Sequence, residues 1–224
     1  MDHVLGVNNY FLATNDHRSD SNDPELRRSS GVMMVFQKDV PGFANLRHLT
    51  DLDIRDKYMV VHTQWAHMDV YFHNVYAPVT NDTREAFFES LPREFPPTSI
   101  HVVMGDFNVP HDRDLDSLHL GVIDAWRLHH PTDKVFSSPK GKHRLDYIFA
   151  DASLVEEAYH TSSYFDCPDP TDHLCHSLTL IPSGPILDTL AHLQTHNLCY
   201  EKHSMLMFVP GTVPTLAFGS PYRM

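Results

Sequence analysis

Apolar runs typical of β-strands recur along most of the chain. They cover residues 31–40, 58–64, 69–79, 100–104, 144–151, 155–165 and 176–181. Residues 65–68 join the second run to the third, and this spacing predicts an antiparallel hairpin. The run at 100–104 is apolar in four of its five positions, as expected for a strand that is buried on both faces.

Helical patterns are fewer and shorter. Asp82 is followed three residues later by Glu85, which is the spacing of a capping box and predicts a short surface helix closed by Pro92. Residues 115–128 indicate a helix, a turn at Gly121 and then an extended piece. A chain with many strands and few helices predicts an α/β (α+β) fold in which two sheets pack together with helices outside.

The pattern divides the chain into three segments. Residues 1–30 are largely polar, and we expect them to be poorly ordered and to supply no metal ligand. Residues 31–181 hold the predicted strands and form the folded domain. Residues 182–224 are an extension of uncertain structure, in which 184–203 has a weak helical pattern.

Composition and charge limit the possible partners. With 224 residues, 42% of them hydrophobic, the chain is long enough to bury one sizeable core. Its formal net charge of −12 argues against tight non-specific binding of nucleic acid, although a metal-filled cleft brings positive charge of its own. No run approaches the roughly 20 apolar residues of a membrane span, and the N-terminus does not resemble a secretory signal.

The cysteines bear on the cellular setting. Cys167, Cys175 and Cys199 have no metal-ligand spacing, and their odd number does not indicate a disulfide framework. We therefore expect an intracellular protein in a reducing compartment, with no membrane partner. The nucleus is a candidate compartment.

Short polar side chains stand at the ends of three predicted strands. Asp106 and Asn108 follow the run at 100–104, Asp146 opens the run at 144–151, and Asp172 and His173 precede the last run. Because strand ends converge on one rim of a layered β-rich core, these side chains can meet in one cleft. Carboxylates with an amide and a histidine suit Mg²⁺ or Mn²⁺ and phosphoryl chemistry better than they suit zinc.

Each of these residues also has a purely structural explanation. Gly105 to Asn108 has the composition of a common turn, in which side chains hydrogen-bond the local backbone. Arg144 next to Asp146 is typical of a surface ion pair of little energetic weight. The pair Asp172 and His173 occurs in helix caps and loops, and Tyr76 in an apolar run is usually a core residue.

The order of five motifs decides between these explanations. They are "NVYAPV" (74–79), "MGDFNVP" (104–110), "DAWRLHHP" (124–131), "HRLDYIFA" (143–150) and "TDH" (171–173). In this order the chain resembles the endonuclease/exonuclease/phosphatase superfamily, above all the apurinic-endonuclease-like domain of exonuclease III and of non-LTR retrotransposons. The resemblance covers residues 31–181 and implies a four-layer sandwich of two packed mixed β-sheets with outer helices.

The resemblance also implies a role for each strand-end residue. Asp106 would activate or orient the attacking water, and Asn108 would hold that water and the scissile phosphate. Asp146 would orient His173, which would contact a phosphate oxygen and stabilise its developing charge. Asp172 would join the metal site, with Mg²⁺ or Mn²⁺ as the cofactor.

The remaining implications concern the substrate and the start of the chain. Tyr76 would hydrogen-bond the phosphate, and the implied activity is metal-dependent endonuclease cleavage of nucleic acid, with DNA as the partner. Family members carry a Gln-Glu pair whose Glu is the principal metal ligand, whereas no such pair precedes Gly31, so we expect the N-terminal part to be missing. Two alternatives stay open: a catalytically incomplete remnant that acts as a binding protein, and a phosphatase or phosphodiesterase of the same superfamily.

Overall fold

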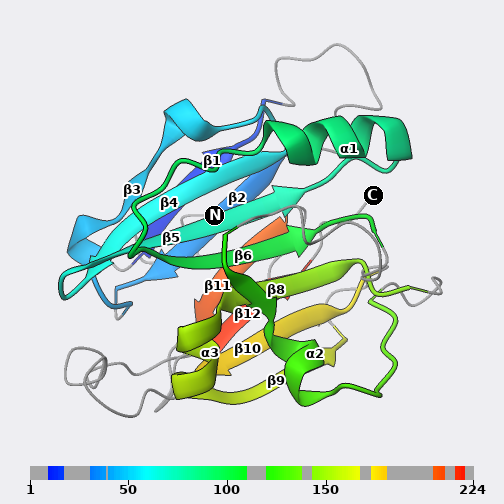
Figure 1. The fold of residues 1–224 in the computed structure, drawn as a ribbon. Helices are drawn as coiled ribbons and strands as arrows, with labels where there is room; N and C mark the ends of the chain where they lie inside the picture. The colour runs from blue at the N-terminus through cyan, green and yellow to red at the C-terminus, as the bar shows by residue number, and fades with distance from the viewer. Residues whose placement is uncertain are drawn as a thin grey trace.

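Two six-stranded β-sheets form the framework of the protein (Figure 1). The first sheet has the order β1-β2-β11-β12-β10-β9 and the second has the order β3-β4-β5-β6-β8-β7. The structure is a computed structural model that describes residues 10–17, 31–38, 40–109, 120–137, 143–166 and 173–180, and the backbone of 204–209 and 215–219.

The strands of the two sheets come from distant parts of the sequence. The first sheet contains β1 (Tyr10–Asn15), β2 (Val32–Gln37), β9 (Tyr159–Phe165), β10 (Cys175–Leu180), β11 (Ser204–Val209) and β12 (Thr215–Gly219). The second contains β3 (Arg47–His48), β4 (Tyr58–Trp65), β5 (Met68–Tyr76), β6 (Ile100–Asp106), β7 (Val122–Asp124) and β8 (Asp146–Asp151). Both sheets are mixed, because β2 pairs with β11 and β5 pairs with β6 in parallel while the other neighbours are antiparallel.

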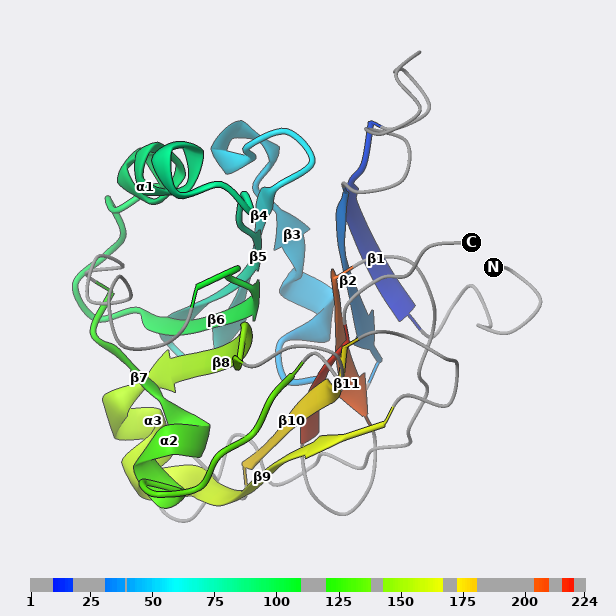
Figure 2. The same cartoon turned by 90° about the vertical axis from the view of Figure 1, so that its right-hand side faces the viewer.

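The sheets face each other across the main hydrophobic core. Figure 2 shows them side by side, with helix α1 (Asn81–Ser90) on the side of the second sheet that faces away from the first. The core between them is built of apolar side chains from inner strands of both sheets, including Met34, Phe36, Phe72, Val102, Met104, Ile148 and Leu178. The predicted fold class, two packed mixed sheets with outer helices, is therefore confirmed.

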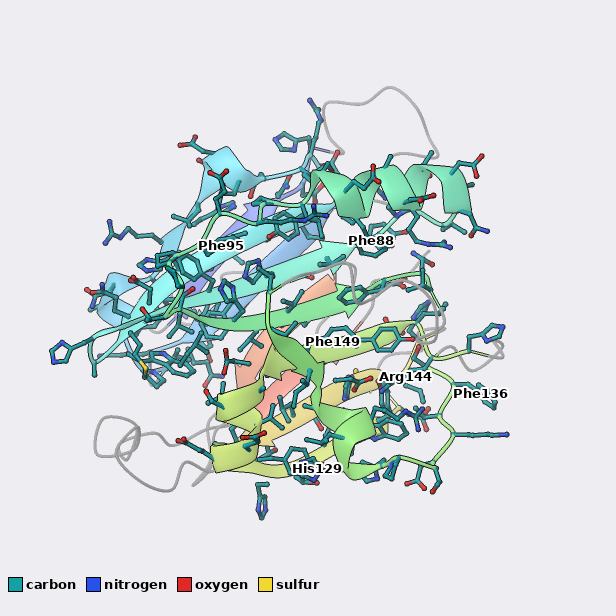
Figure 3. The ribbon with its side chains drawn as sticks, viewed as in Figure 1. Phe88, Phe95, His129, Phe136, Arg144 and Phe149 are labelled. Atoms are coloured by element: carbon teal, nitrogen blue, oxygen red, sulfur yellow. The ribbon has the colours of Figure 1, made fainter. Side chains whose placement is uncertain are left out.

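A second core lies on the outer face of the second sheet. Phe87, Phe88 and Leu91 of the α1 region pack there against residues of β4, β6 and β8, such as Tyr58, Val103 and Phe149. Figure 3 shows Phe88 beneath α1 and Phe149 on β8. The second sheet is thus buried on both faces, which explains why the run at 100–104 is almost continuously apolar.

Most predicted strands are present, and two local predictions need correction. The hairpin is confirmed as β4 and β5, and its turn uses Ala66 in the left-handed region at φ 55°. Residues 155–158 are helical rather than extended, because they belong to α3 (Ala152–Ala158), which Asp151 caps by accepting the Ser153 N–H. The N-terminal cap of α1 is Thr80, not Asp82.

Short elements complete the described chain. Helix α2 (Ala125–His129) follows β7, and two 3-10 turns lie at Phe43–Asn45 and Thr50–Leu52. In the described part of the chain no helix is long and apolar enough to cross a membrane. Cys175 is disulfide-bonded, which the odd number of cysteines did not indicate.

The first sheet draws strands from all three predicted segments. β1 comes from residues 1–30, and the hairpin of β11 and β12 comes from residues 182–224. This hairpin lies between β2 and β10, in the middle of the sheet. Apart from Asp16 and His17, the other residues of those two segments, including 184–203, lie outside the described residues, so the boundaries at 30 and 181 and the poor order of the rest of 1–30 stay predictions.

Acid is expected to destabilise the fold through His176. Burial in β10, reinforced by the Arg144 charge, lowers the pKa of this side chain from 6.5 to about 3, although Asp124 opposes the shift. Below pH 6.5 His176 binds a proton in the unfolded chain but not in the folded chain. The free energy of unfolding therefore falls by up to about 1.4 kcal/mol for each pH unit. The loss continues until the pH approaches the folded pKa. Urea unfolding across a series of pH values measures it.

The variant His176→Phe is the matched control for this prediction. It removes the titrating group while Ser162 Oγ, the hydrogen-bond partner of His176 Nε2, keeps its bond to the Ser177 carbonyl oxygen at 2.9 Å. The variant should lose stability less steeply with acid than the unaltered chain. Equal slopes for the two chains would show that His176 does not carry the effect.

Candidate active site

Three polar residues stand side by side at one edge of the second sheet. The parallel strands β5 and β6 end together, so Tyr76 pairs with Asp106, and Asp106 in turn pairs with Asp146 at the start of antiparallel β8. Residues in register on adjacent strands point to the same face of a sheet. This face is the inner one, because Tyr76 packs against the core between the sheets.

Gly105 allows the strands to approach closely just before this edge. Its φ is 143°, and a Cβ atom at this position would lie 1.9 Å from the Val75 carbonyl oxygen on the neighbouring strand. Backbone atoms cannot move aside cheaply, so only glycine fits here. The glycine therefore places Asp106 next to Tyr76 at the end of β5.

Asp106, Asp146 and His173 form a compact cluster. Each offers one ligand atom, and these three atoms lie within 4.8 Å of one another. His173 Nδ1 is 2.7 Å from Asp146 Oδ2, and both carboxylates are buried, with 3% of Asp106 and none of Asp146 exposed. Among the described residues, the buried Asp146 Oδ1 has no hydrogen-bond partner.

The buried environment makes the Asp106 carboxyl a weaker acid than an ordinary aspartate. Burial and the neighbouring Asp146 charge raise the pKa of the Asp106 carboxyl from 3.8 to about 7. The His173 charge, the Asn108 N–H and the Lys57 charge oppose this rise. Two carboxylates packed together without a counterion repel each other, which makes the site a favourable place for a cation.

Asn108 is held in place by its own turn. Its φ is 52°, in the left-handed region that asparagine tolerates better than most residues. Its backbone N–H donates to Asp106 Oδ1 at 2.9 Å, and its Nδ2 donates to the Ala77 carbonyl oxygen at 2.8 Å. The turn explanation is thus correct for the backbone, and the same turn presents Asn108 beside Asp106.

The comparisons bear on the fold and on the relatives of this chain. No protein-family model matches the chain. Over 164 residues it is 30% identical to the "Transposon TX1 uncharacterized 149 kDa protein" of Xenopus laevis, a match that covers 62% of this chain and 12% of that protein. The structure of the AP endonuclease LMAP from Leishmania major has a TM-score of 0.51 at 14% identity, over 77% of this chain and 71% of the other. The chain has the endonuclease/exonuclease/phosphatase fold.

A second solved structure has a lower TM-score. The catalytic domain of Xenopus laevis APE2 has a TM-score of 0.44 at 19% identity, over 62% of this chain and 60% of that domain. The resemblance that the five motifs predicted is confirmed at the level of the endonuclease/exonuclease/phosphatase fold. The chain spans a small part of its transposon relative, so the activity of that longer protein does not transfer directly.

The endonuclease/exonuclease/phosphatase fold brings four predicted site residues together. Asp106, Asn108, Asp146 and His173 meet at one edge through the contacts described above. Tyr76 lies in the same row of strand ends. The sixth predicted residue, Asp172, lies outside the described residues, so its place at the metal stays a prediction.

Ser137 joins the two halves of the cluster and was not predicted. It is fully buried, and its Oγ accepts the backbone N–H groups of Leu145 at 2.8 Å and Asp146 at 3.2 Å. Its carbonyl oxygen accepts the Leu174 N–H. One serine therefore fixes the start of β8 and the residue after His173.

The expectation of a surface ion pair at Arg144 was wrong. The guanidinium is buried and pairs with Asp124, the N-terminal cap of α2. It lies 4.9 Å from the Trp126 ring centroid and 4.4 Å from that of Tyr147. A paired and buried charge of this kind is costly to break, so it anchors α2 to the strand that begins with Asp146.

The donor set fits a divalent cation that binds oxygen. The cluster offers two buried carboxylates that need a counterion, and the Asp146 Oδ1 atom has no other described partner. Carboxylate oxygens are the usual ligands of Mg²⁺ and Mn²⁺. His173 belongs to the same cluster, because its Nδ1 atom lies 2.7 Å from Asp146 Oδ2.

Proposed function

We propose that the protein is a metal-dependent phosphodiesterase that cuts DNA as an endonuclease, with Mg²⁺ or Mn²⁺ as its cofactor. The observation that carries the proposal is the cluster of Asp106, Asp146 and His173 at one sheet edge. The similarity to a transposon protein and to the fold of an AP endonuclease supports nucleic acid as the substrate. We further propose that it works inside the cell, with the nucleus as the candidate compartment.

Asp106 is the residue that accepts a proton from the attacking water. Its pKa of about 7 means that a large fraction of the carboxyls are ionised at neutral pH and still basic enough to take a proton. Asn108 lies in the turn after it and orients that water and the scissile phosphate. The hydrogen bond from the Asn108 N–H holds the carboxylate in one orientation.

His173 acts on the phosphate from the other side of the cluster. The hydrogen bond between its Nδ1 and Asp146 fixes the orientation of the ring. The Nε2–H group then donates to a phosphate oxygen as negative charge develops in the transition state. Tyr76 at the end of β5 supplies a further hydrogen bond to the phosphate.

Asp146, whose Oδ1 has no hydrogen-bond partner among the described residues, is the residue that would hold the cation, and Asp172 is the proposed further ligand. When bound, the cation would neutralise phosphate charge beside these carboxylates. A protein that holds DNA without cutting it is the alternative, and the same superfamily also contains phosphatases. The assay below separates cutting from binding.

DNA cleavage by the purified chain is expected to depend strictly on metal. Mg²⁺ or Mn²⁺ should support nicking of supercoiled plasmid and of a duplex with an abasic site, because the cation would offset the negative charge that develops on the phosphate beside two carboxylates. Chelation should abolish nicking, and added metal should restore it, as measured by gel electrophoresis.

Two outcomes would contradict the proposal. Nicking that survives chelation would rule out the metal-dependent site. A chain that binds duplex DNA with metal present and cuts neither substrate would identify a binding protein instead.

A further inference from the structure

Lys57 lies in a tight turn beside the candidate site. The turn is bounded by Ile54 and Tyr58, which form an isolated β-bridge. Asn15, at the end of β1, donates through Nδ2 to the carbonyl oxygens of these two residues at 2.9 Å and 2.7 Å. Its Oδ1 accepts the N–H of Asp56, whose φ of 59° makes the turn sharp. One buried side chain thus fixes the turn that carries Lys57.

The turn extends the row of polar residues at the sheet edge. The Tyr76 N–H donates to the Lys57 carbonyl oxygen at 2.7 Å, and Tyr76 pairs with Asp106 on its other side. The Lys57 Nζ atom lies 4.0 Å from the centroid of the Tyr76 ring. The ammonium is therefore placed over the aromatic residue next to Asp106.

The charge of this ammonium acts on the site. Burial lowers the pKa of Lys57, and the charges of Asp56 and Asp106 raise it. Within the described part of the chain, Nζ makes no hydrogen bond and no close ion pair, and its near neighbour is the Tyr76 ring. A half-buried ammonium with three N–H donors is thus left to bind an anion.

We propose that Lys57 binds a phosphate oxygen of the DNA backbone beside Asp106. This assignment rests on the proposed function, because the ligand is the phosphodiester of the substrate. Two carboxylates at the site, in a chain of net charge −12, would repel such an anion. Lys57 offsets that repulsion with a charge that belongs to the chain, in addition to the charge of the metal.

The test measures DNA binding in chelator, so that it does not depend on cleavage. A fluorescent DNA duplex is titrated with the unaltered chain and with the variants Lys57→Met, Lys57→Arg and Lys38→Met. Methionine keeps the length of the side chain without its charge. Lys38 is exposed and follows the last residue of β2. The turn that carries Lys57 lies at the other end of this strand, where the Gly31 N–H donates to the Asp56 carbonyl oxygen. It is therefore a matched lysine far from the turn.

Lys57→Met should raise the Kd for DNA on the order of fivefold. It should also reduce the slope of log Kd against log salt by about one, which corresponds to the loss of one phosphate contact. Lys57→Arg should keep most of that slope, and Lys38→Met should change neither quantity. Thermal unfolding of Lys57→Met should match the unaltered chain within a few degrees, which separates lost binding from lost folding.

The outcomes distinguish this assignment from the proposed function. If the unaltered chain binds and cuts DNA while Lys57→Met behaves like Lys38→Met, the assignment of Lys57 is wrong. The proposed nuclease function is then still supported. If the unaltered chain neither binds nor cuts DNA, both proposals fall together.

Discussion

Replacing Asp106 by asparagine is expected to lower the rate of metal-dependent DNA nicking at least about a hundredfold. Asparagine keeps the shape of the side chain, and its oxygen can still accept the Asn108 N–H that Asp106 accepts at 2.9 Å. What is lost is the group that takes the proton from water. Initial rates of plasmid nicking at saturating metal measure the change.

The same replacement should leave the fold as stable as before, or more stable. The raised pKa of Asp106 shows that burial and Asp146 disfavour its charge, so a neutral amide removes a repulsion. The matched control is Asp133→Asn, which makes the same chemical change at a side chain that is 60% exposed. If Asp106→Asn nicks DNA as fast as Asp133→Asn, Asp106 is not the base.

Removing β11 and β12 is expected to abolish cooperative unfolding. In a chain that ends at residue 203, β2 and β10 each lose one of their two neighbours. The first sheet is then reduced to two separate two-stranded ribbons, β1 with β2 and β9 with β10. Two-stranded ribbons are marginal in water, and a native domain is stable by only about 5–15 kcal/mol. Thermal unfolding followed by circular dichroism should show no sharp transition.

A chain that ends at Gly219 is the control, because it keeps both strands. The point variant Met207→Pro tests the same idea without truncation. Met207 pairs with Val35 on one side and Ala217 on the other, and proline removes a donor from the middle of the sheet. If the chain ending at 203 unfolds like the control, the hairpin does not hold the sheet together.

Local pattern was enough for the four longer strands of the second sheet and for much of the site. β4, β5, β6 and β8 carry their own signal, because they are apolar runs bounded by turn residues. The polar residues after β6 and at the start of β8 stand out because they interrupt such runs. Once strand ends were expected to converge, Asp106, Asp146 and His173 could be grouped from the sequence.

The missed features depend on partners that are distant in sequence. β11 becomes a strand beside β2, and nothing in its own residues marks that neighbour. Ser137 and Lys57 lie in loops, and their roles come from backbone groups that the fold brings to them. The sequence pattern predicts strand at 155–158, whereas the cap at Asp151 starts a helix that runs through these residues.

The parallel pairing of β2 with β11 also has a consequence for how the protein is made. Val32 pairs with Ser204, so the first sheet joins residues from near both ends of the chain. During synthesis β2 leaves the ribosome long before β11 does, because about 170 residues separate Val32 from Ser204. Contacts this distant in sequence form slowly, and until they form, the apolar strand β2 has an open edge that can pair with other chains. The yield of folded protein in a cell should therefore depend on chaperones and on growth temperature more than the small size of the domain suggests.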